Sequence, residues 1–244
     1  MRPPFRIFPL AALLFMLPAI ALAKPVVGSG VIKTETREVG GFHGVALSVP
    51  ARLELRQGAR EALAVTGDDN VLPLIRTEVD NGVLKIRWAD DDTYATRNRE
   101  ITIVVDAKTL DGITLGGSGQ IFAAQIKTAT LDAKIGGSGE IIIAALDADT
   151  ARVTIGGSGK MSAAGRSGTL EATLAGSGEL LAAKLETRHA RATLHGSARA
   201  TVWAKETLKA TIAGSAEVIY YGKPAVSQTI AGSGSVMRAG DAPQ

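Results

Sequence analysis

The nine residues Ala151–Gly159 read Ala-Arg-Val-Thr-Ile-Gly-Gly-Ser-Gly, and versions of this phrase recur through the second half of the chain. A Gly-Ser-Gly or Gly-Ser-Ala triplet closes each of seven copies. Successive serines are 20, 20, 19, 20, 18 and 18 residues apart. Self-similarity at such a nearly constant period is typical of a solenoid, in which each repeat forms one coil. The serines are Ser118, Ser138, Ser158, Ser177, Ser197, Ser215 and Ser233.

Hydrophobicity alternates in the residues before each serine. The third residue before the serine is always Ile or Leu, and the fourth is Thr except at Lys134. The fifth is small or apolar except at Gln228. Period-two alternation predicts strands with one buried face, whereas a helical repeat needs a period of about 3.6 and a leucine-rich repeat a different Leu and Asn spacing. We therefore predict an all-β fold, a single-stranded parallel β-helix with rungs of 18–20 residues.

Two columns of charges support stacking of the rungs in register. Equivalent residues of neighbouring strands lie about 4.8 Å apart, where like charges repel. The column two residues after each serine alternates in sign, and the column six residues before it breaks only between Arg191 and Lys209. The first column is Gln120, Glu140, Lys160, Glu179, Arg199, Glu217 and Ser235, and the second is Gly112, Asp132, Arg152, Glu171, Arg191, Lys209 and Ser227.

The Gly-Ser triplets are interpreted as corners of the solenoid. Glycine permits the positive φ of a tight corner, and a serine hydroxyl can bond a nearby backbone group or a hydroxyl stacked above it. Ala198 and Ala216 replace the last glycine in two rungs, so this position does not require a positive φ. No corner has the Gly-x-Ser-x-Gly of a nucleophile elbow, and the period is wrong for calcium-binding nonapeptide repeats. The seven serines are therefore predicted to be architectural.

Residues 24–105 are less regular and are predicted to be capping strands that begin the same solenoid. Strand-like runs occupy residues 45–49, 51–56, 62–66, 75–79, 83–88 and 101–105. Asn81-Gly82 predicts a type I′ hairpin turn, residues 69–74 allow one helical turn, and residues 89–99 are expected to form an exposed loop. With no Pro- or Ser-rich linker, residues 24–244 are predicted to form one domain, with the seven Gly-Ser rungs at 106–240.

Residues 1–23 are predicted to be a signal peptide. Arg2 and Arg6 precede the apolar run Leu10–Leu22, and Ala21-Leu22-Ala23 suits a signal peptidase. The run is shorter than the roughly 20 residues that span a bilayer, and Pro18 interrupts it. We expect an exported protein that begins at Lys24 and lies in the periplasm or at the cell surface. It would have no transmembrane span and no lipid anchor on Cys, since the chain has none.

Composition excludes several classes of function. The chain has 27 Lys and Arg against 24 Asp and Glu, and without a basic block this gives no reason to expect nucleic acid. The lack of Cys excludes disulfides, thiolate zinc sites and a cysteine nucleophile. Hydrophobic residues make up 45% but aromatic residues only 4%, so the core must consist of Ala, Val, Ile and Leu.

The order of these features resembles the putative auto-transporter adhesin, head GIN domain family of exported bacterial proteins. The resemblance rests on the repeated Gly-Ser-Gly corners and on four earlier pieces, Gly28-Ser29-Gly30, Thr36–Val39, Gly41-Phe42 and Val79–Ile86. It covers residues 28 to 240, nearly the whole chain after the leader. It implies a β-helical fold and a surface or adhesive role, and it supplies no catalytic residues and no cofactor.

Few residues suggest a ligand site. His189 and His195 are six residues apart, and His43 is distant in sequence, so we interpret them as exposed polar residues. The clusters Asp68-Asp69-Asn70 and Asp90-Asp91-Asp92 offer oxygen ligands for a hard cation, but such runs are more often solvated turns. Aromatic residues gather in the last rungs, where they either cover the end of the core or form a ligand surface. These residues are Trp203, Tyr220 and Tyr221.

These patterns favour an exported, non-catalytic binding or structural protein, with an adhesin-like role and an envelope, glycan or protein ligand. One alternative is a carbohydrate-active enzyme, because β-helices can host polysaccharide cleavage, which needs convergent carboxylates. Another is a periplasmic accessory factor of the cell envelope. Self-association through the open ends of the solenoid is also expected, because unpaired strand edges template further pairing.

Overall fold

The computed structural model of the chain describes residues 24–90, 94–97 and 100–243. The predicted signal peptide, residues 1–23, therefore lies outside the described residues, as do Asp91 and Asp92. Among the residues described, none forms a helix long and apolar enough to cross a bilayer.

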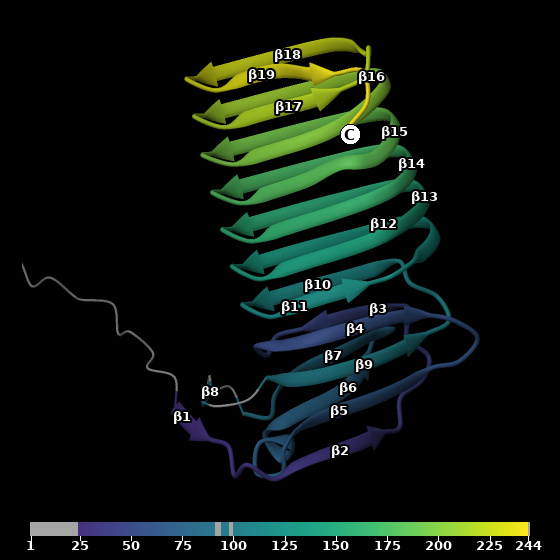
Figure 1. Cartoon of the computed structure of the whole chain (residues 1–244), viewed down its shortest axis with the longest axis vertical. Helices are drawn as coiled ribbons and strands as arrows, with labels where there is room; N and C mark the ends of the chain where they lie inside the picture. Colours follow the sequence, from purple (N-terminus) through teal and green to yellow (C-terminus); the bar gives the residue numbers. More distant parts are fainter. Residues whose placement is uncertain (1–23, 91–93, 98–99, 244) are drawn as a thin grey trace, which may run out of the picture.

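Residues 112–240 form a parallel β-solenoid of about six turns, which confirms the predicted fold class (Figure 1). Every strand pairing in this region is parallel and in the register predicted from the repeat, for example Glu140 with Lys160 and Ile155 with Leu174. The strands are β10 (Gly112–Gly117), β11 (Gln120–Ala123), β12 (Ile126–Gly137), β13 (Glu140–Gly157), β14 (Lys160–Gly176), β15 (Glu179–Gly196), β16 (Arg199–Gly214), β17 (Glu217–Tyr221), β18 (Ala225–Gly232) and β19 (Ser235–Gly240).

Each rung has two legs joined by a bend, and the bend contains a short paired segment of its own, residues 146–148 in β13. In β13 the first leg is residues 140–143, directly after a Gly-Ser corner, and the second leg is residues 150–157, which lead to the next corner. Stacked first legs make one sheet and stacked second legs make the other, called here the first-leg and second-leg sheets. The register shifts at the bend, between Ile143 and Leu146 in one rung and between Ala182 and Glu186 in another. These irregularities absorb the differences in repeat length.

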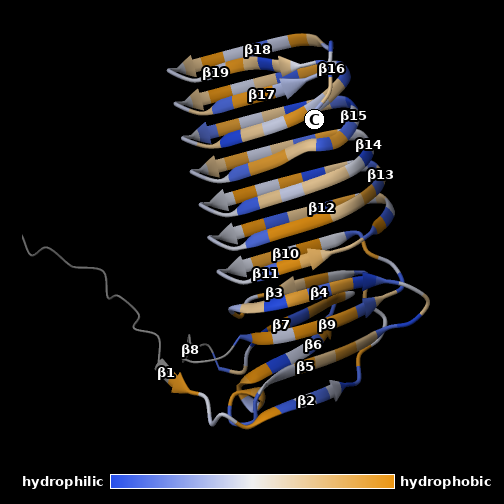
Figure 2. Cartoon of the chain, in the orientation of Figure 1, coloured by the Kyte–Doolittle hydropathy of each residue, from blue (hydrophilic) through white to orange (hydrophobic). Residues whose placement is uncertain are grey.

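The core lies between the two sheets. Side chains alternate between buried and exposed along the legs of the middle rungs, such as those of β13 and β15, and Figure 2 shows the same alternation in hydropathy. Ile141 and Ile155 are fully buried, and Val153 and Ala172 are at most 3% exposed. Burial of such apolar side chains supplies roughly 1.5–3 kcal/mol for each large one, and this is the main term that holds the rungs together.

The corners depend on the first glycine of each triplet. Gly157 has φ +118° and Gly176 has φ +106°, a region that strongly favours glycine. The backbone ladder continues around the corner, because Ser177 N–H donates to the Gly157 carbonyl at 3.0 Å. The expected hydroxyl ladder is not formed. The seven corner serines are exposed, and within the described part of the chain their hydroxyls make no hydrogen bond.

The charge columns stack as predicted. In the first column, Lys160 Nζ lies 3.4 Å from Glu179 and Arg199 Nε lies 2.7 Å from Glu217. In the second column, Arg152 Nε lies 3.2 Å from Glu171, the acid of the next rung. Arg191 and Lys209, where the alternation breaks, are direct neighbours on adjacent rungs. The sign alternation therefore reports the true register.

The N-terminal cap differs from a simple first coil. It comprises β2 (Ile32–Arg37), β3 (Gly44–Leu47), β4 (Ala51–Gln57), β5 (Ala62–Asp68), β6 (Ile75–Asp80), β7 (Val83–Trp88) and β9 (Ile101–Ala107). Three of its pairings are antiparallel: β2 with β5, β5 with β9, and β6 with β7. Strand β2 was not predicted. The β6–β7 hairpin was predicted. Its turn residues Asn81 and Gly82 have φ 49° and 74°, as a type I′ turn requires.

The rungs nearest the cap do not follow chain order. Strand β3 pairs with β7 on one side and β10 on the other, and β4 pairs with β9 and β11. The rung of residues 44–57 is thus inserted between two rungs that come later in the chain. The cap strands therefore come before the repeats in the chain but do not stack on them in chain order.

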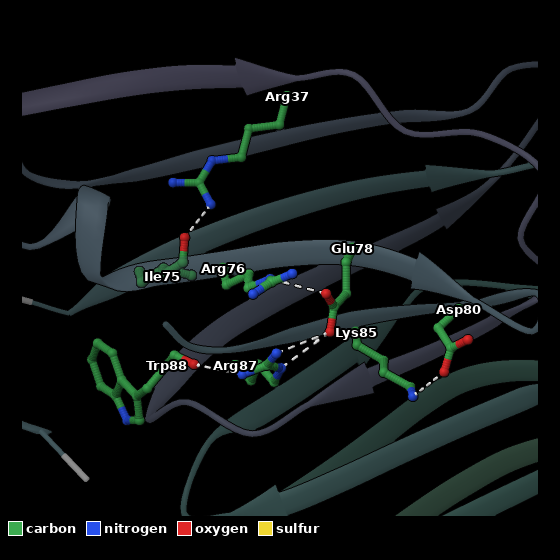
Figure 3. Close-up of polar contacts among 8 residues, drawn as sticks. All are labelled: Arg37, Ile75, Arg76, Glu78, Asp80, Lys85, Arg87 and Trp88. Carbon is green, nitrogen blue, oxygen red and sulfur yellow. Dashed lines mark hydrogen bonds and ion pairs between the residues drawn. The ribbon is translucent and has the colours of Figure 1, made fainter. Parts of the chain in front are cut away.

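Side chains at the cap tie its strands together (Figure 3). Glu78 of β6 bridges Arg76 at 2.9 Å and Arg87 of β7 at 3.1 Å, and Lys85 contacts Asp80 at 2.6 Å. Arg37 of β2 reaches across to the β6 side and donates to the Ile75 carbonyl at 2.6 Å. The cap is therefore closed by charged hydrogen bonds as well as by backbone pairing.

Two smaller elements complete the N-terminal region. The 3₁₀ helix η1 (Leu72–Leu74) is the helical turn expected after residue 69. Strand β8 (Tyr94–Arg97) lies within the segment expected to be a loop, and it pairs in parallel with β1 (Lys24–Val27). A two-stranded pairing between segments this far apart leaves no local signal in the sequence, which explains the wrong expectation.

Candidate binding surface

The outer face of the first-leg sheet carries a row of seven side chains, five of them apolar, called here the apolar column. Each member is the fourth residue after a corner serine, and all are paired in register along the solenoid. They are set apart from the core, because from Phe122 to Thr201 each member is partly exposed and lies between two buried neighbours. The column consists of Phe122, Ile142, Ser162, Leu181, Thr201, Ile219 and Met237.

A shallow hollow of about 370 Å³ interrupts this column. Ser162 lies between the larger Ile142 and Leu181, so its short side chain leaves space between them. Three alanines at the bend, Ala144, Ala164 and Ala183, extend the hollow sideways. Lys184 is the one charged residue among the lining residues described. The result is an apolar depression with a cation at its edge, an arrangement suited to an amphiphile.

Trp203 and Tyr221 extend the apolar face toward the C-terminal end. They are direct neighbours on adjacent rungs, and both are partly exposed at the bend that follows the first leg. Trp203 also lines a second hollow of about 380 Å³, together with Lys205, Lys223 and Asp241. Partly exposed aromatic rings beside charged groups can contact an amphipathic ligand through both their faces and their edges.

Tyr220 does not join the other two aromatic residues. It pairs with Val202, which is fully buried, and it packs partly buried against the hydrophobic core. Of the three residues predicted as a ligand surface, Tyr220 thus lies with the core at the open end, while Trp203 and Tyr221 lie at the bend.

Asp241 sits among cations at the edge of the second hollow. Its carboxylate lies 3.2 Å from Lys223 Nζ and also bonds Arg238. Hydrogen bonds from Lys223 and Arg238 hold the pKa of Asp241 below its ordinary value. The carboxylate is thus ionised at neutral pH and is engaged by Lys223 and Arg238.

The Gly-Ser corners line a polar groove of about 490 Å³ over the last rungs. Its walls include Ser177, Ser197 and Ser215, with Glu179 and Glu217 on either side of Arg199. Each of these carboxylates has a basic partner, Lys160 or Arg199. General acid–base cleavage of a glycoside needs two carboxyl groups that converge on one bond, and this groove instead alternates acid with base.

A second polar groove lies at the bend, near Asp147 and Arg166. The guanidinium of Arg166 donates twice to Asp147, at 2.9 and 2.8 Å. This paired hydrogen bond holds the pKa of Asp147 below its ordinary value. The pair joins β13 to β14 across a register shift and so reinforces the bend.

The acidic run at residues 68–70 has a structural role. Asp68 Oδ1 accepts from the Gly30 amide at 2.7 Å, Asp69 Oδ1 accepts from the Ser29 hydroxyl at 2.5 Å, and the Asn70 side chain accepts from the Ser29 amide at 3.0 Å. The run therefore clasps the N-terminal segment. The Ser29 hydrogen bond holds the pKa of Asp69 below its ordinary value.

His43 and His189 make separate contacts with different partners. His43 Nδ1 lies 2.7 Å from Asp111 near the cap, and His189 Nδ1 lies 2.9 Å from the Thr207 hydroxyl. In the part of the chain that the structure describes, no three His, Asp or Glu side chains are arranged to hold a metal ion.

The apolar column was missed in the sequence, although its signal is present. Phe, Ile, Leu, Ile and Met recur at the fourth position after the corner serine. The period-two rule places that position on the same outer face as the charge two residues after the serine. An outward apolar position repeated over several rungs marks a candidate contact surface.

The fold and this face define a β-solenoid protein with an exposed apolar surface. The chain belongs to the family described as putative auto-transporter adhesin, head GIN domain, whose pattern matches residues 41–224. The family resemblance found in the sequence is thereby confirmed. No curated protein matches the chain.

Solved structures show the same fold. A putative adhesin from Bacteroides fragilis superposes with a TM-score of 0.83 at 23% identity, covering 88% of this chain and 100% of that one. A putative lipid binding protein from Parabacteroides distasonis has a TM-score of 0.76 at 26% identity, with the same two coverages. A putative adhesin from Parabacteroides merdae has a TM-score of 0.70 at 19% identity, covering 89% and 100%.

Proposed function

We propose that this chain is an exported, non-catalytic binding protein that engages an apolar or amphiphilic ligand with the outer face of its first-leg sheet. The observation that carries the proposal is the apolar column with its hollow between Ile142 and Leu181. The adhesin description of the family supports a binding role. The Parabacteroides distasonis protein, which is described as lipid binding, supports an apolar ligand.

The flat geometry of the site suits contact with an extended surface. The hollow of the apolar column is lined by three adjacent rungs and opens to the outside, so a ligand would lie across several rungs and would not be enclosed. Lys184 would contact an anionic head group while the neighbouring apolar side chains contact the hydrocarbon. Each buried leucine-sized contact contributes roughly 1.5–3 kcal/mol, so affinity would come from several contacts together.

Cellular location forms part of the same proposal. The leader at residues 1–23 would be removed on export, and residues 24–244 would act as one β-helical domain in the periplasm or at the cell surface. Protease shaving of intact cells, followed by fractionation, distinguishes the two sites. Recovery of the protein in the cytoplasm with its leader uncleaved would contradict export.

Binding to phospholipid vesicles tests the ligand class directly. The probe is vesicles of phosphatidylcholine with and without phosphatidylglycerol, and the readout is cosedimentation of the protein. Leu181→Glu, which places a charge beside the hollow, is expected to weaken binding at least tenfold, because charge is costly to bring against hydrocarbon. Thr173→Glu, on the outer face of the second-leg sheet, is the matched control and should bind like the wild type.

Three results would overturn the proposal. Equal vesicle binding by Leu181→Glu and the wild type would show that this face is not the contact surface. Release of reducing or unsaturated ends from a polysaccharide panel would show an enzyme. Selective binding to a polysaccharide without cleavage would replace the apolar ligand with a glycan.

A further inference from the structure

The two ends of the solenoid differ in how their strand edges are protected. At the N-terminal end the outermost strands are β2 and β6, which carry Lys33, Glu35, Arg37, Arg76, Glu78 and Asp80. At the C-terminal end the outermost strands are β18 and β19, where Arg238 is the only charged residue. Natural proteins usually protect an edge strand with charges, because an unprotected edge pairs with another strand.

The C-terminal edge is also apolar on its inner side. Val226 and Ile230 of β18 are 41% and 38% exposed, whereas Leu208 and Ile212, their partners on β16, are 1% exposed. The last layer of the core is thus left open. In the described chain, β18 pairs only with β16 and β19 only with β17, so one edge of each strand lacks a partner.

Asp241 and Ala242 lie away from this edge. Asp241 and Ala242 share a hollow with Trp203 and Lys205 of the rung below, so the last described residues turn back along the solenoid. In Figure 1 the C-terminus likewise lies beside lower rungs and away from the outer edge of β18 and β19. Arg238, the one charge on this edge, is engaged by Asp241 and by the Gly222 carbonyl.

The charges of the last rung favour a second copy of this chain as the occupant. Both charge columns end in neutral residues, Ser227 and Ser235, after alternating in sign over the rungs below. Two copies related by a two-fold axis carry identical charges, so a charged column end would bring like charges into one interface. The charged edges of β2 and β6 make a head-to-tail stack unfavourable by comparison.

We propose that two copies of this protein associate tail to tail through β18 and β19. A two-fold axis perpendicular to the solenoid axis reverses strand direction across the interface, so the new pairing is antiparallel. The association continues both sheets from one molecule into the other and buries Val226 and Ile230. It is closed at two copies, because the opposite end of the described solenoid is protected by the charged strands β2 and β6. The first-leg face of each copy stays accessible, and the proposal does not depend on the ligand.

Charge on the edge provides the test, with the oligomeric state of the exported, processed protein as readout. Sedimentation over a concentration series in the micromolar range is expected to show a two-chain species for the wild type. Thr229→Lys, on the outer face of β18, is expected to give a single-chain species. Lysine is compatible with this column, because Lys134 occupies it between Thr114 and Thr154. Thr193→Lys, in the same column at mid-solenoid, is the matched control and should remain a two-chain species.

Cysteine cross-linking gives an independent readout, because the natural chain contains no Cys. Thr229→Cys is expected to form an intermolecular disulfide on mild oxidation, and Thr173→Cys, far from the edge, is expected to remain reduced. A single-chain wild type across the series would overturn the proposal. So would a two-chain Thr229→Lys, a growing head-to-tail polymer, or a stoichiometric complex of this edge with a different polypeptide.

Discussion

At three Gly-Ser corners the last glycine packs against an isoleucine side chain of the rung below. A methyl group added at Gly178 would lie 2.5 Å from Ile155 Cγ2, and glycines 159 and 234 stand in the same relation to isoleucines 135 and 212, at 2.4 Å. Ala198 and Ala216 instead follow rungs in which that position is leucine, although Gly139 also follows such a rung, above Leu115. Isoleucine carries Cγ2 on its stiff Cβ, whereas leucine branches one atom further out and can move.

This match predicts a specific compensation. Gly178→Ala should lower the free energy of unfolding by roughly 1–3 kcal/mol, because it overpacks the corner against Ile155. In an Ile155→Leu background the loss should be clearly smaller. Urea unfolding of the four proteins in a double-mutant cycle measures the coupling. Gly176→Ala, whose φ of +106° is the obstacle, should not be compensated by the same change. Equal losses in both backgrounds would refute the match.

Asp69 couples the N-terminal clasp to pH. Because its folded-state pKa lies below the unfolded value, the ionised carboxylate stabilises the fold above the ordinary Asp pKa of about 3.9. That contribution is lost as the pH falls through the folded-state pKa. Ser29→Ala removes the main cause of the lowered pKa, so it should destabilise the protein at neutral pH. The difference from the wild type should shrink on acidification in urea unfolding at a series of pH values. A difference independent of pH would contradict this linkage.

At the scale of elements, the stacked charges set register more than they add stability. The one like-charged step, Arg191 beside Lys209, is therefore an opportunity for stabilisation. Lys209→Glu restores the alternation and should raise stability by roughly 0.2–1 kcal/mol. The thermal midpoint measures this gain, which should decrease in high salt because exposed charges are screened. Lys209→Gln, which removes the repulsion without adding an attraction, should give an intermediate thermal midpoint. If Lys209→Glu were no more stable than Lys209→Gln, the stabilising effect of alternating charges would be contradicted.

Local pattern explains why the repeats were predictable. The Ile or Leu three residues before each serine and the charges around it specify strand, face and register, because each rung contacts only its neighbours. The insertion of residues 44–57 between later rungs and the pairing of β1 with β8 were not predictable in this way, since they join segments that carry no shared repeat. Strand β2 was missed because its sequence, Ile-Lys-Thr-Glu-Thr-Arg, has no alternation of apolar and polar residues.

The candidate surface was predictable only in part. Trp203 and Tyr221 were identified because aromatic residues are rare in this chain, and Tyr220 was included because composition alone does not assign a face. The apolar column required the register to be known before its members could be seen as neighbours. The hollow depends on Ser162 being small between Ile142 and Leu181, a property of packing that a linear pattern does not display.

At the scale of the whole molecule, stability should be graded along the axis. Ile155 is fully buried in the middle, whereas Ile230, in the same column on the last rung, is 38% exposed. Ile155→Ala should cost roughly 2–5 kcal/mol and Ile230→Ala distinctly less in the single-chain state. Urea unfolding in the Thr229→Lys background measures both without interference from association. Similar losses at the two sites would show that the last rung is covered.

The inserted rung of residues 44–57 has a consequence for how the chain matures. A polypeptide that crosses a membrane with its N-terminus first presents this rung before either of the rungs that flank it. Its backbone groups find partners only after residues 83–88 and then 112–117 have emerged, whereas every later coil can settle on a finished template. We therefore expect a slow initiation that requires nearly half the chain, followed by rapid coil-by-coil addition that runs in one direction only.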